Sequence, residues 1–178
     1  MTLRTATAED VAAMTAIYDW HVRHGVGTFE EVAPSVDEMA ARMAAVRARG
    51  LPWVVIERDG RVAAFAYAAP FRLRAAYRYT AEDSVYVAPD AQRAGLGRAA
   101  LAAVIDHCEA MGVRQLVAVI GDSANTGSIG LHQALGFRPA GLLPGVGYKH
   151  AQWLDVVLMV RALGGGPVGT PSHGGLAL

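Results

Sequence analysis

The sequence predicts a single α/β domain in which a mixed sheet carries helices on both faces. Segments with strand and helix periodicity follow one another in the order strand, two helices, hairpin, strand, helix, strand, helix and two strands. With 178 residues, the chain is long enough to bury the core of one domain. Its 53% hydrophobic and 18% charged residues are typical of a globular, rather apolar protein.

The first half of the chain supplies a strand, two helices and a hairpin. Apolar residues at helical spacing after Thr7 predict the first helix. The capping-box spacing of Ser35 and Glu38 predicts the second. Asp59-Gly60 is a strong two-residue hairpin signal between two alternating segments. These elements are a strand at 3–5, helices at 8–24 and 35–49, and strands at 53–57 and 61–69.

The second half alternates strands with helices and ends in a tail. Pro70 ends the hairpin, and a basic, aromatic loop follows over residues 71–79. Gly112 and Gly136 are expected to cap the carboxyl ends of the two helices. The elements are strands at 85–87, 116–120, 137–141 and 153–161 and helices at 96–111 and 126–135. Residues 1–163 then form the single domain, and we expect the Gly- and Pro-rich tail, 164–178, to be disordered.

Composition and charge argue against several classes of function. The 16 basic and 16 acidic residues balance, which argues against a general electrostatic grip on nucleic acid. No apolar run is long enough to span a bilayer, and the amino terminus lacks a signal-peptide pattern. Cys108 is the only cysteine, so we expect a buried structural thiol, no disulfide and no metal site. A cytoplasmic location fits best.

One stretch, residues 85–98, reads as a strand that leads into a helix beginning with two glycines. The unpaired N–H groups at a helix start carry partial positive charge and suit a phosphate ligand. Gly95 and Gly97 let such a ligand approach the backbone, and Arg93 and Arg98 add positive charge beside it. The stretch therefore indicates a phosphate-bearing ligand, with a glycine-containing turn before an ordinary core helix as the alternative.

The spacing of this loop argues against two common nucleotide sites and resembles a third. No Gly-Lys-Ser/Thr follows it, as a Walker loop requires, and the third glycine of a dinucleotide fingerprint is absent. Gln92-Arg93-x-Gly95-x-Gly97 resembles the coenzyme A loop, Gln/Arg-x-x-Gly-x-Gly/Ala, of the GCN5-related N-acetyltransferases (GNAT). Residues 125–137 resemble a second motif of that family, Asn-x-x-Ala/Ser…Tyr-x-x-x-Gly-Phe.

The resemblance implies the GNAT fold and acetyl-CoA as cosubstrate. In that fold the central twisted sheet is mixed and mostly antiparallel, with helices on both faces. For Asn125 and Ser128, capping of the second motif's helix is the alternative role. The cofactor-binding residues that the resemblance implies are Tyr86, Val87, Gln92, Arg93, Ala94, Gly95, Leu96, Gly97, Arg98, Asn125 and Ser128.

Four further strings narrow the resemblance to one branch of the family. Residues 66–71, 77–82, 117–121 and 147–150 resemble the phosphinothricin and methionine sulfone N-acetyltransferases, and the likeness runs over residues 3–161. It implies acetylation of the α-amino group of a small amino-acid analogue, such as phosphinothricin, methionine sulfone or methionine sulfoximine. It also implies a homodimer.

Acetyl transfer from a thioester to an amine needs a base, an oxyanion donor and an acid for the thiolate. The resemblance implies that Glu82 is the general base, acting through a water, whereas by itself it would read as a solvated carboxylate at a strand entry. His132 occupies the helix position where many acetyltransferases carry a proton-donating tyrosine, with a hydrogen-bonded packing histidine as the alternative. We expect the Val87 main chain to donate to the oxyanion.

The acceptor needs a counter-charge for its carboxylate and polar partners for a sulfone, sulfoximine or phosphinate. Arg72 and Arg74 provide forked donors suited to such oxygens. We expect Thr28, Phe29 and Tyr77 to form the pocket wall. The only lysine, Lys149, and its neighbour His150 lie in one of the matching strings, and no role is assigned to them.

Three alternatives stay open at this point. A non-catalytic acyl-CoA sensor would keep the glycine loop, residues 92–97. It would not need Glu82 together with the arginine loop, residues 71–79. Another small amine, such as a polyamine, is disfavoured because two arginines beside the pocket repel polycations. The third alternative is an acetyltransferase whose acceptor is a protein amino terminus.

Overall fold

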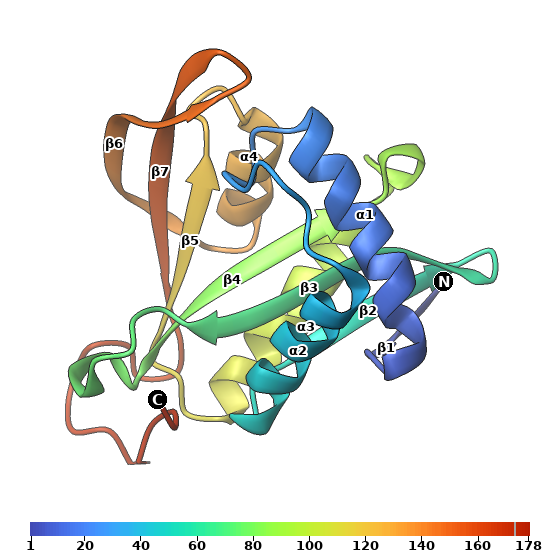
Figure 1. Cartoon of the computed structure of the whole chain (residues 1–178). Coiled ribbons are helices and arrows are strands. Elements are labelled where there is room, and N and C mark those ends of the chain that lie inside the picture. The colour runs from blue at the N-terminus through green and yellow to red at the C-terminus, as the bar shows by residue number, and fades with distance from the viewer. Residues whose placement is uncertain (173) are drawn as a thin grey trace.

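The computed structural model describes residues 1–172 and 174–178 and contains one seven-stranded sheet with helices on both faces (Figure 1). The strand order is β1-β2-β3-β4-β5-β7-β6, in which the β4–β5 pair is parallel and the other pairs are antiparallel. The predicted fold class is therefore confirmed. The elements are β1 (Thr2–Thr5), η1 (Ala8–Asp10), α1 (Val11–His24), α2 (Val36–Ala48), β2 (Trp53–Arg58), β3 (Arg61–Pro70), η2 (Ala75–Tyr77), β4 (Thr80–Val87), η3 (Pro89–Ala91), α3 (Leu96–Ala110), β5 (Gln115–Gly121), α4 (Thr126–Ala134), β6 (Arg138–Lys149) and β7 (Gln152–Ala162).

Side-chain alternation along β4 divides its contacts between the two faces of the sheet. Tyr86 points toward α1, where its ring meets Tyr18 edge to face with 4.9 Å between centroids. The next residue, Val87, points toward α3 and packs beside Gly97. In Figure 1, α1 and α2 cross the near face of β2–β4 and α3 lies behind it. Each face of the central strands is therefore buried under helix, which places the core on both sides of the sheet.

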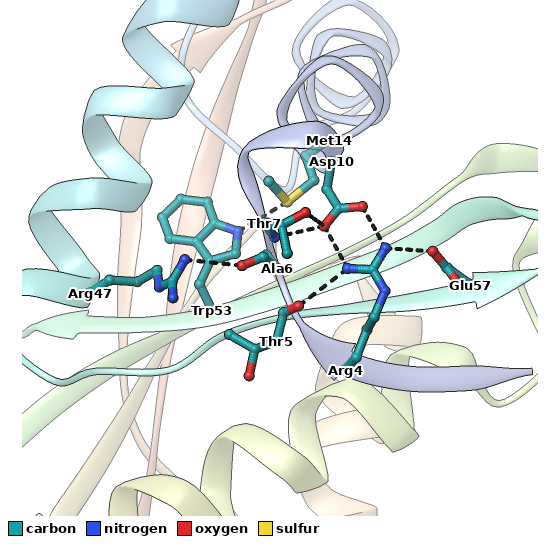
Figure 2. Close-up of polar contacts among 9 residues, drawn as sticks. All are labelled: Arg4, Thr5, Ala6, Thr7, Asp10, Met14, Arg47, Trp53 and Glu57. Carbon is teal, nitrogen blue, oxygen red and sulfur yellow. Dashed lines mark hydrogen bonds and ion pairs between the residues drawn. The ribbon is translucent and has the colours of Figure 1, made fainter.

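The start of α1 is joined to β1 and β2 by a partly buried ion-pair cluster (Figure 2). Both Asp10 carboxylate oxygens accept from the Arg4 guanidinium at 2.7 Å, and Arg4 also contacts Glu57. The Arg4 hydrogen bonds hold the pKa of Asp10 below its usual range. Deeper in the core, the Trp53 indole N–H lies 3.1 Å from the Met14 sulfur. These contacts set the position of α1 on the sheet.

The two central strands pair for only part of their length and then separate. Parallel pairing between β4 and β5 covers residues 80–83 and 115–118, and both strands continue beyond it. Their divergence is visible in Figure 1, where β5 rises while β4 runs toward α1. The Ala88 N–H donates to the Ala63 carbonyl of β3, so by alternation the Val87 and Val85 main-chain groups face the gap. The sheet thus opens just ahead of the coenzyme A-like motif at residues 92–97.

Two strands differ from their predicted bounds. β4 begins at Thr80, so Glu82 lies inside a strand, not just ahead of one. Polar residues in its first half hide the strand pattern, because Asp83 occupies a buried position where an apolar residue is expected. β6 continues to Lys149, past the predicted end at residue 141, and register shifts between residues 139–141 and 143–147 explain why its pattern is irregular.

The carboxyl-terminal tail has contacts with the domain that its composition does not predict. The Arg114 guanidinium donates to the Gly166 and Val168 carbonyls at 2.8 and 2.7 Å. Leu176 is buried, and its N–H donates to the Arg78 carbonyl at 2.6 Å. Elsewhere, Cys108 is buried on α3 as predicted, and burial raises the pKa of its thiol to about 12.

Candidate active site

Two adjoining cavities open where β4 and β5 separate. The first, which we call the splay cavity, has a volume of about 340 Å³ and is lined by the facing segments of β4 and β5, residues 25–27 and α4. The second, the loop cavity, has about 390 Å³ and lies over the glycine loop and the start of α3. Val85, Asn125 and Ser128 line both. A ligand that extends from one cavity to the other passes these three residues.

The glycine loop shapes the loop cavity as the sequence predicts. Gly95 has a φ of +78° and precedes the first residue of α3, and Arg93 has a φ of +62°. A Cβ on Gly97 would lie 3.3 Å from Val87 Cγ2 and 3.4 Å from a Leu131 methyl carbon, so glycine allows the close packing there. The predicted cofactor residues that line this cavity are Val87, Gln92, Arg93, Gly95, Leu96, Gly97, Arg98, Asn125 and Ser128.

Two other predicted cofactor residues have different surroundings. Tyr86 lines the splay cavity while its ring packs on Tyr18. Ala94 lies exposed in the glycine loop and lines neither of these cavities. Asn125 also caps α4, because its Oδ1 accepts from the Ser128 N–H at 3.2 Å. The helix-cap alternative for Asn125 is therefore confirmed, and it is compatible with lining the cavities.

Glu82 is half-buried on the α1–α2 side of β4. Burial raises its pKa, the neighbouring Asp83 charge adds to the rise, and Arg72 opposes it. A raised pKa moves a carboxylate toward the range in which it removes protons efficiently near neutral pH. Glu82 therefore has the electrostatic surroundings of a general base, and it lies outside the lining of both cavities.

His132 lies on α4 and pairs with Asp83, which β4 places on the face opposite Glu82. The Asp83 Oδ1 is 2.9 Å from His132 Nε2, and His132 Nδ1 is 2.8 Å from the Ser128 carbonyl oxygen. His132 and Asp83 side chains are only 3% and 1% exposed. Burial alone would lower the pKa of His132, but the hydrogen bonds to Asp83 and Ser128 raise it above its usual value.

The segment between α1 and α2 is held against the splayed strands by contacts that the sequence analysis missed. Lys149 is buried, and its ammonium donates to the Gly25 and Thr28 carbonyls at 3.0 and 2.7 Å. Phe29 lies so close to Gly147 that a Cβ there would be 2.3 Å from its ring. Lys149 stood out as the only lysine, but its partners are 124 and 121 residues away.

Two further groups on α1 were also missed, of which His21 lines the splay cavity. The His21 Nε2–H donates to the Val87 carbonyl at 2.9 Å, and burial lowers the pKa of His21. The Tyr18 hydroxyl bonds Thr28 Oγ1 at 2.9 Å, so the predicted pocket residue Thr28 is anchored to α1. Tyr18 and His21 are three residues apart, so they lie on the same face of α1. This spacing is the sequence signal from which their proximity could have been predicted.

The predicted acceptor residues fall into two groups that the structure does not bring together. Thr28 and Phe29 lie beside the splayed ends of β4 and β5. Arg72, Arg74 and Tyr77 lie on the exposed loop before β4, at the other end of that strand, and line neither cavity (Figure 1). The Arg72 charge nevertheless acts on Glu82, so Arg72 connects this loop electrostatically with the candidate base.

Within residues 1–172 and 174–178, no group of His, Cys, Asp and Glu side chains is arranged to hold a metal ion. The same residues include no helix that is both long and apolar enough to cross a membrane.

Comparisons with known proteins agree with this geometry. The model of the acetyltransferase (GNAT) family matches residues 13–137. The chain is 51% identical over 170 residues to a phosphinothricin N-acetyltransferase of Alcaligenes faecalis, covering 96% of this chain and 86% of that protein. It is 38% identical over 159 residues to an L-methionine sulfoximine/L-methionine sulfone acetyltransferase of Salmonella typhimurium, covering 89% and 92% of the two proteins.

A solved structure is similar over nearly the whole chain. It is a phosphinothricin acetyltransferase from Sinorhizobium meliloti in complex with acetyl-CoA, with a TM-score of 0.93 and 44% sequence identity. The match covers 98% of this chain and 94% of that one. The resemblance that the two sequence motifs predict is therefore confirmed at the level of the fold.

Proposed function

The chain belongs to the acetyltransferase (GNAT) family and uses acetyl-CoA as cosubstrate, and we propose that its acceptor is the α-amino group of a small amino-acid analogue. The acceptors in question are phosphinothricin, methionine sulfone and methionine sulfoximine, because relatives named for them are 51% and 38% identical to this chain. The observation that carries the proposal is the pair of joined cavities at the splayed strands. One cavity suits the cosubstrate and the other the reacting groups.

The loop cavity has the chemistry that acetyl-CoA requires. The N-terminus of α3 presents unpaired N–H groups to a pyrophosphate, and Arg93 and Arg98 stand beside it. Glycine at position 97 lets the start of α3 pack closely against Val87 and Leu131, which line the same cavity. The pantetheine arm then passes Asn125 and Ser128 into the splay cavity. The residues present therefore fit this ligand.

In the proposed reaction, Glu82 removes a proton from the acceptor ammonium through a water. The free amine attacks the thioester carbonyl, and the Val87 N–H, which faces the gap between the strands, donates to the developing oxyanion. The His21 Nε2–H donates to the Val87 carbonyl and so holds the backbone at the end of β4 in place. The thiolate that leaves then needs a proton, for which His132 is the candidate from the sequence.

Arg72 is the proposed partner of the acceptor carboxylate. In an α-amino acid the carboxylate is attached to the carbon that bears the amine, so it must lie near Glu82 when Glu82 reaches the amine. The Arg72 charge is felt at Glu82, and the Arg72 side chain is otherwise exposed. Arg74 and Tyr77 belong to the same loop and remain candidates for contacts with the acceptor side chain.

We also infer a homodimer formed through β6. Nearly all of β6 is exposed, and it carries an apolar surface that includes Leu142, Leu143 and Val146 at 53%, 44% and 56% exposure. Trp153 on β7, 71% exposed, extends this surface. Exposed apolar area of this kind at a sheet edge favours association with another chain. Sedimentation equilibrium tests the inference, which predicts twice the monomer mass for the wild type and the monomer mass for Leu142→Asp.

The experiment that tests the proposed function is thiol release from acetyl-CoA with a panel of acceptors. The panel contains methionine sulfone, methionine sulfoximine, phosphinothricin, spermidine and a short peptide. Turnover of the first three alone supports the proposal. Turnover of spermidine or the peptide would favour the alternative acceptors, and binding of acetyl-CoA without any turnover would favour an acyl-CoA sensor.

A further inference from the structure

His132 is poorly placed to give a proton to the coenzyme A sulfur directly. Its side chain is 3% exposed. Both ring nitrogens already have partners, Asp83 Oδ1 at 2.9 Å and the Ser128 carbonyl at 2.8 Å. The Ser128 hydroxyl oxygen is 3.4 Å from Nδ1, so a proton that leaves Nδ1 meets Ser128 first. A group nearer the ligand is needed.

Ser128 lines both cavities, whereas His132 lines only the splay cavity. Three residues line both cavities, and Val85 has no side-chain proton to give. The Asn125 side chain is committed at both ends, to the Ser128 N–H and the Gly121 carbonyl. In the described part of the chain, the partner that the structure gives the Ser128 hydroxyl is His132 Nδ1, at 3.4 Å. Ser128 therefore has a transferable proton, access to the ligand and a nitrogen behind it.

The number of protons in this array follows from the bonding partners. A carbonyl oxygen only accepts, so His132 Nδ1 carries a proton toward Ser128. A second proton must lie between His132 Nε2 and Asp83 Oδ1, because both atoms would otherwise be acceptors at 2.9 Å. The Asp83–His132 pair thus holds one proton more than a neutral imidazole beside a carboxylate. That extra proton is available for transfer.

We propose that the Ser128 hydroxyl is the acid that protonates the departing thiolate, with His132 and Asp83 as positioning residues that resupply its proton. This inference rests on the proposed function. As the tetrahedral intermediate collapses, the carbon–sulfur bond breaks and its electron pair stays on sulfur. Sulfur takes the Ser128 Oγ proton, and Oγ takes the Nδ1 proton of His132. A neutral imidazole remains, hydrogen-bonded to the Asp83 carboxylate, and solvent protonates it again before the next turnover.

The surroundings of the pair contain few other charges. Asp83, on β4, is the charged group in contact with His132, and Cys108 on α3 is the titratable group that faces Asp83. The Phe137 ring stacks edge to face on His132, with 5.0 Å between centroids, and shields it from water. Burial lowers the pKa of His132 and Asp83 is the charged group that raises it, so a change at Asp83 should appear in the pH profile.

The test compares Ser128→Ala with Ser128→Thr in steady-state acetylation of methionine sulfone. We expect kcat to fall by about 100-fold in the alanine variant, with a nearly unchanged KM for acetyl-CoA, and the threonine variant to recover most of the loss. Asp83→Asn should move the fall of kcat at alkaline pH to lower pH, because His132 loses the carboxylate that favours its proton. Thr126→Ala, an exposed substitution on the same helix, is the matched control.

Each outcome decides the assignment. An unchanged kcat in Ser128→Ala overturns it, as does a variant that raises only the KM for acetyl-CoA, since Ser128 then merely binds the pantetheine arm. A second readout does not depend on turnover. In the free protein, the proton shared by His132 and Asp83 should give a far-downfield line in the proton NMR spectrum, which Asp83→Asn removes. Its absence from the wild type overturns the array, whereas a present line with no acetylation overturns the proposed function alone.

Discussion

Replacing Lys149 with methionine should loosen the segment that borders the splay cavity. Methionine keeps most of the apolar stem but removes the ammonium that donates to the Gly25 and Thr28 carbonyls. Hydrogen bonds to a charged group contribute about 1.5–3 kcal/mol each. Burial also disfavours the ammonium and lowers its pKa, which offsets part of the gain. We therefore expect Lys149→Met to lower the free energy of unfolding by about 2–3 kcal/mol.

The assay is thermal unfolding combined with steady-state kinetics. For a chain of this length, each kcal/mol lowers Tm by about 2–4 °C, so a fall of about 5–10 °C is expected. Because residues 25–27 line the splay cavity, the KM for the acceptor should rise about tenfold while the KM for acetyl-CoA stays nearly constant. Arg47→Met is the matched control, since it removes a cation that donates to the Ala6 carbonyl far from the cavities. Equal Tm and equal acceptor KM in wild type and Lys149→Met would refute the reasoning.

Three further predictions concern the proposed roles of single residues. Glu82→Gln should lower kcat by at least about 100-fold without weakening acetyl-CoA binding. Because burial raises the pKa of Glu82, kcat/KM of the wild type should rise with pH through that pKa. This rise should be absent from the pH profile of the variant. Arg72→Ala should raise the acceptor KM by about 10–100-fold, through loss of a charge-assisted bond to the carboxylate, and a defect in acetyl-CoA binding instead would show that the loop is misplaced. Gly97→Val should raise the KM for acetyl-CoA by about tenfold, because even the Cβ of the valine would lie 3.3 Å from Val87. An unchanged affinity for acetyl-CoA in isothermal titration calorimetry would contradict this prediction.

The parts of the site that the sequence predicted are local in the chain. The glycine loop and the start of α4 each carry their signal within a few residues, because helix starts, caps and close backbone approaches depend on neighbours. The strand positions of Glu82 and Asp83 on opposite faces follow from alternation in the same way. The resemblance to the acetyltransferases rests on these local patterns.

The contacts that the sequence could not give join residues distant in the chain. Asp83 and His132 are 49 residues apart, and only the registration of α4 over β4 brings them within 2.9 Å. Lys149 reaches the Gly25 carbonyl across 124 residues, through the placement of the β6–β7 hairpin. The sequence around His132 and around Lys149 does not indicate which residue each contacts, since such pairing depends on the packing of the whole fold.

The separation of the predicted acceptor residues has a similar origin. Arg72 and Arg74 precede β4 closely in sequence, which suggested one cluster with Thr28 and Phe29. The eight-residue strand places the two groups at its opposite ends. The distance between the loop at residues 71–79 and the splay cavity therefore depends on the length of β4. The sequence did not show that length, because the first half of β4 is rich in polar residues.

The most direct test of the central claim is the identity of the product formed from methionine sulfone and acetyl-CoA. Mass spectrometry and NMR should show methionine sulfone acetylated on its α-nitrogen, with one free thiol released for each acetyl group transferred. Methionine sulfone recovered unmodified after prolonged incubation, with acetyl-CoA intact although bound, would contradict the account.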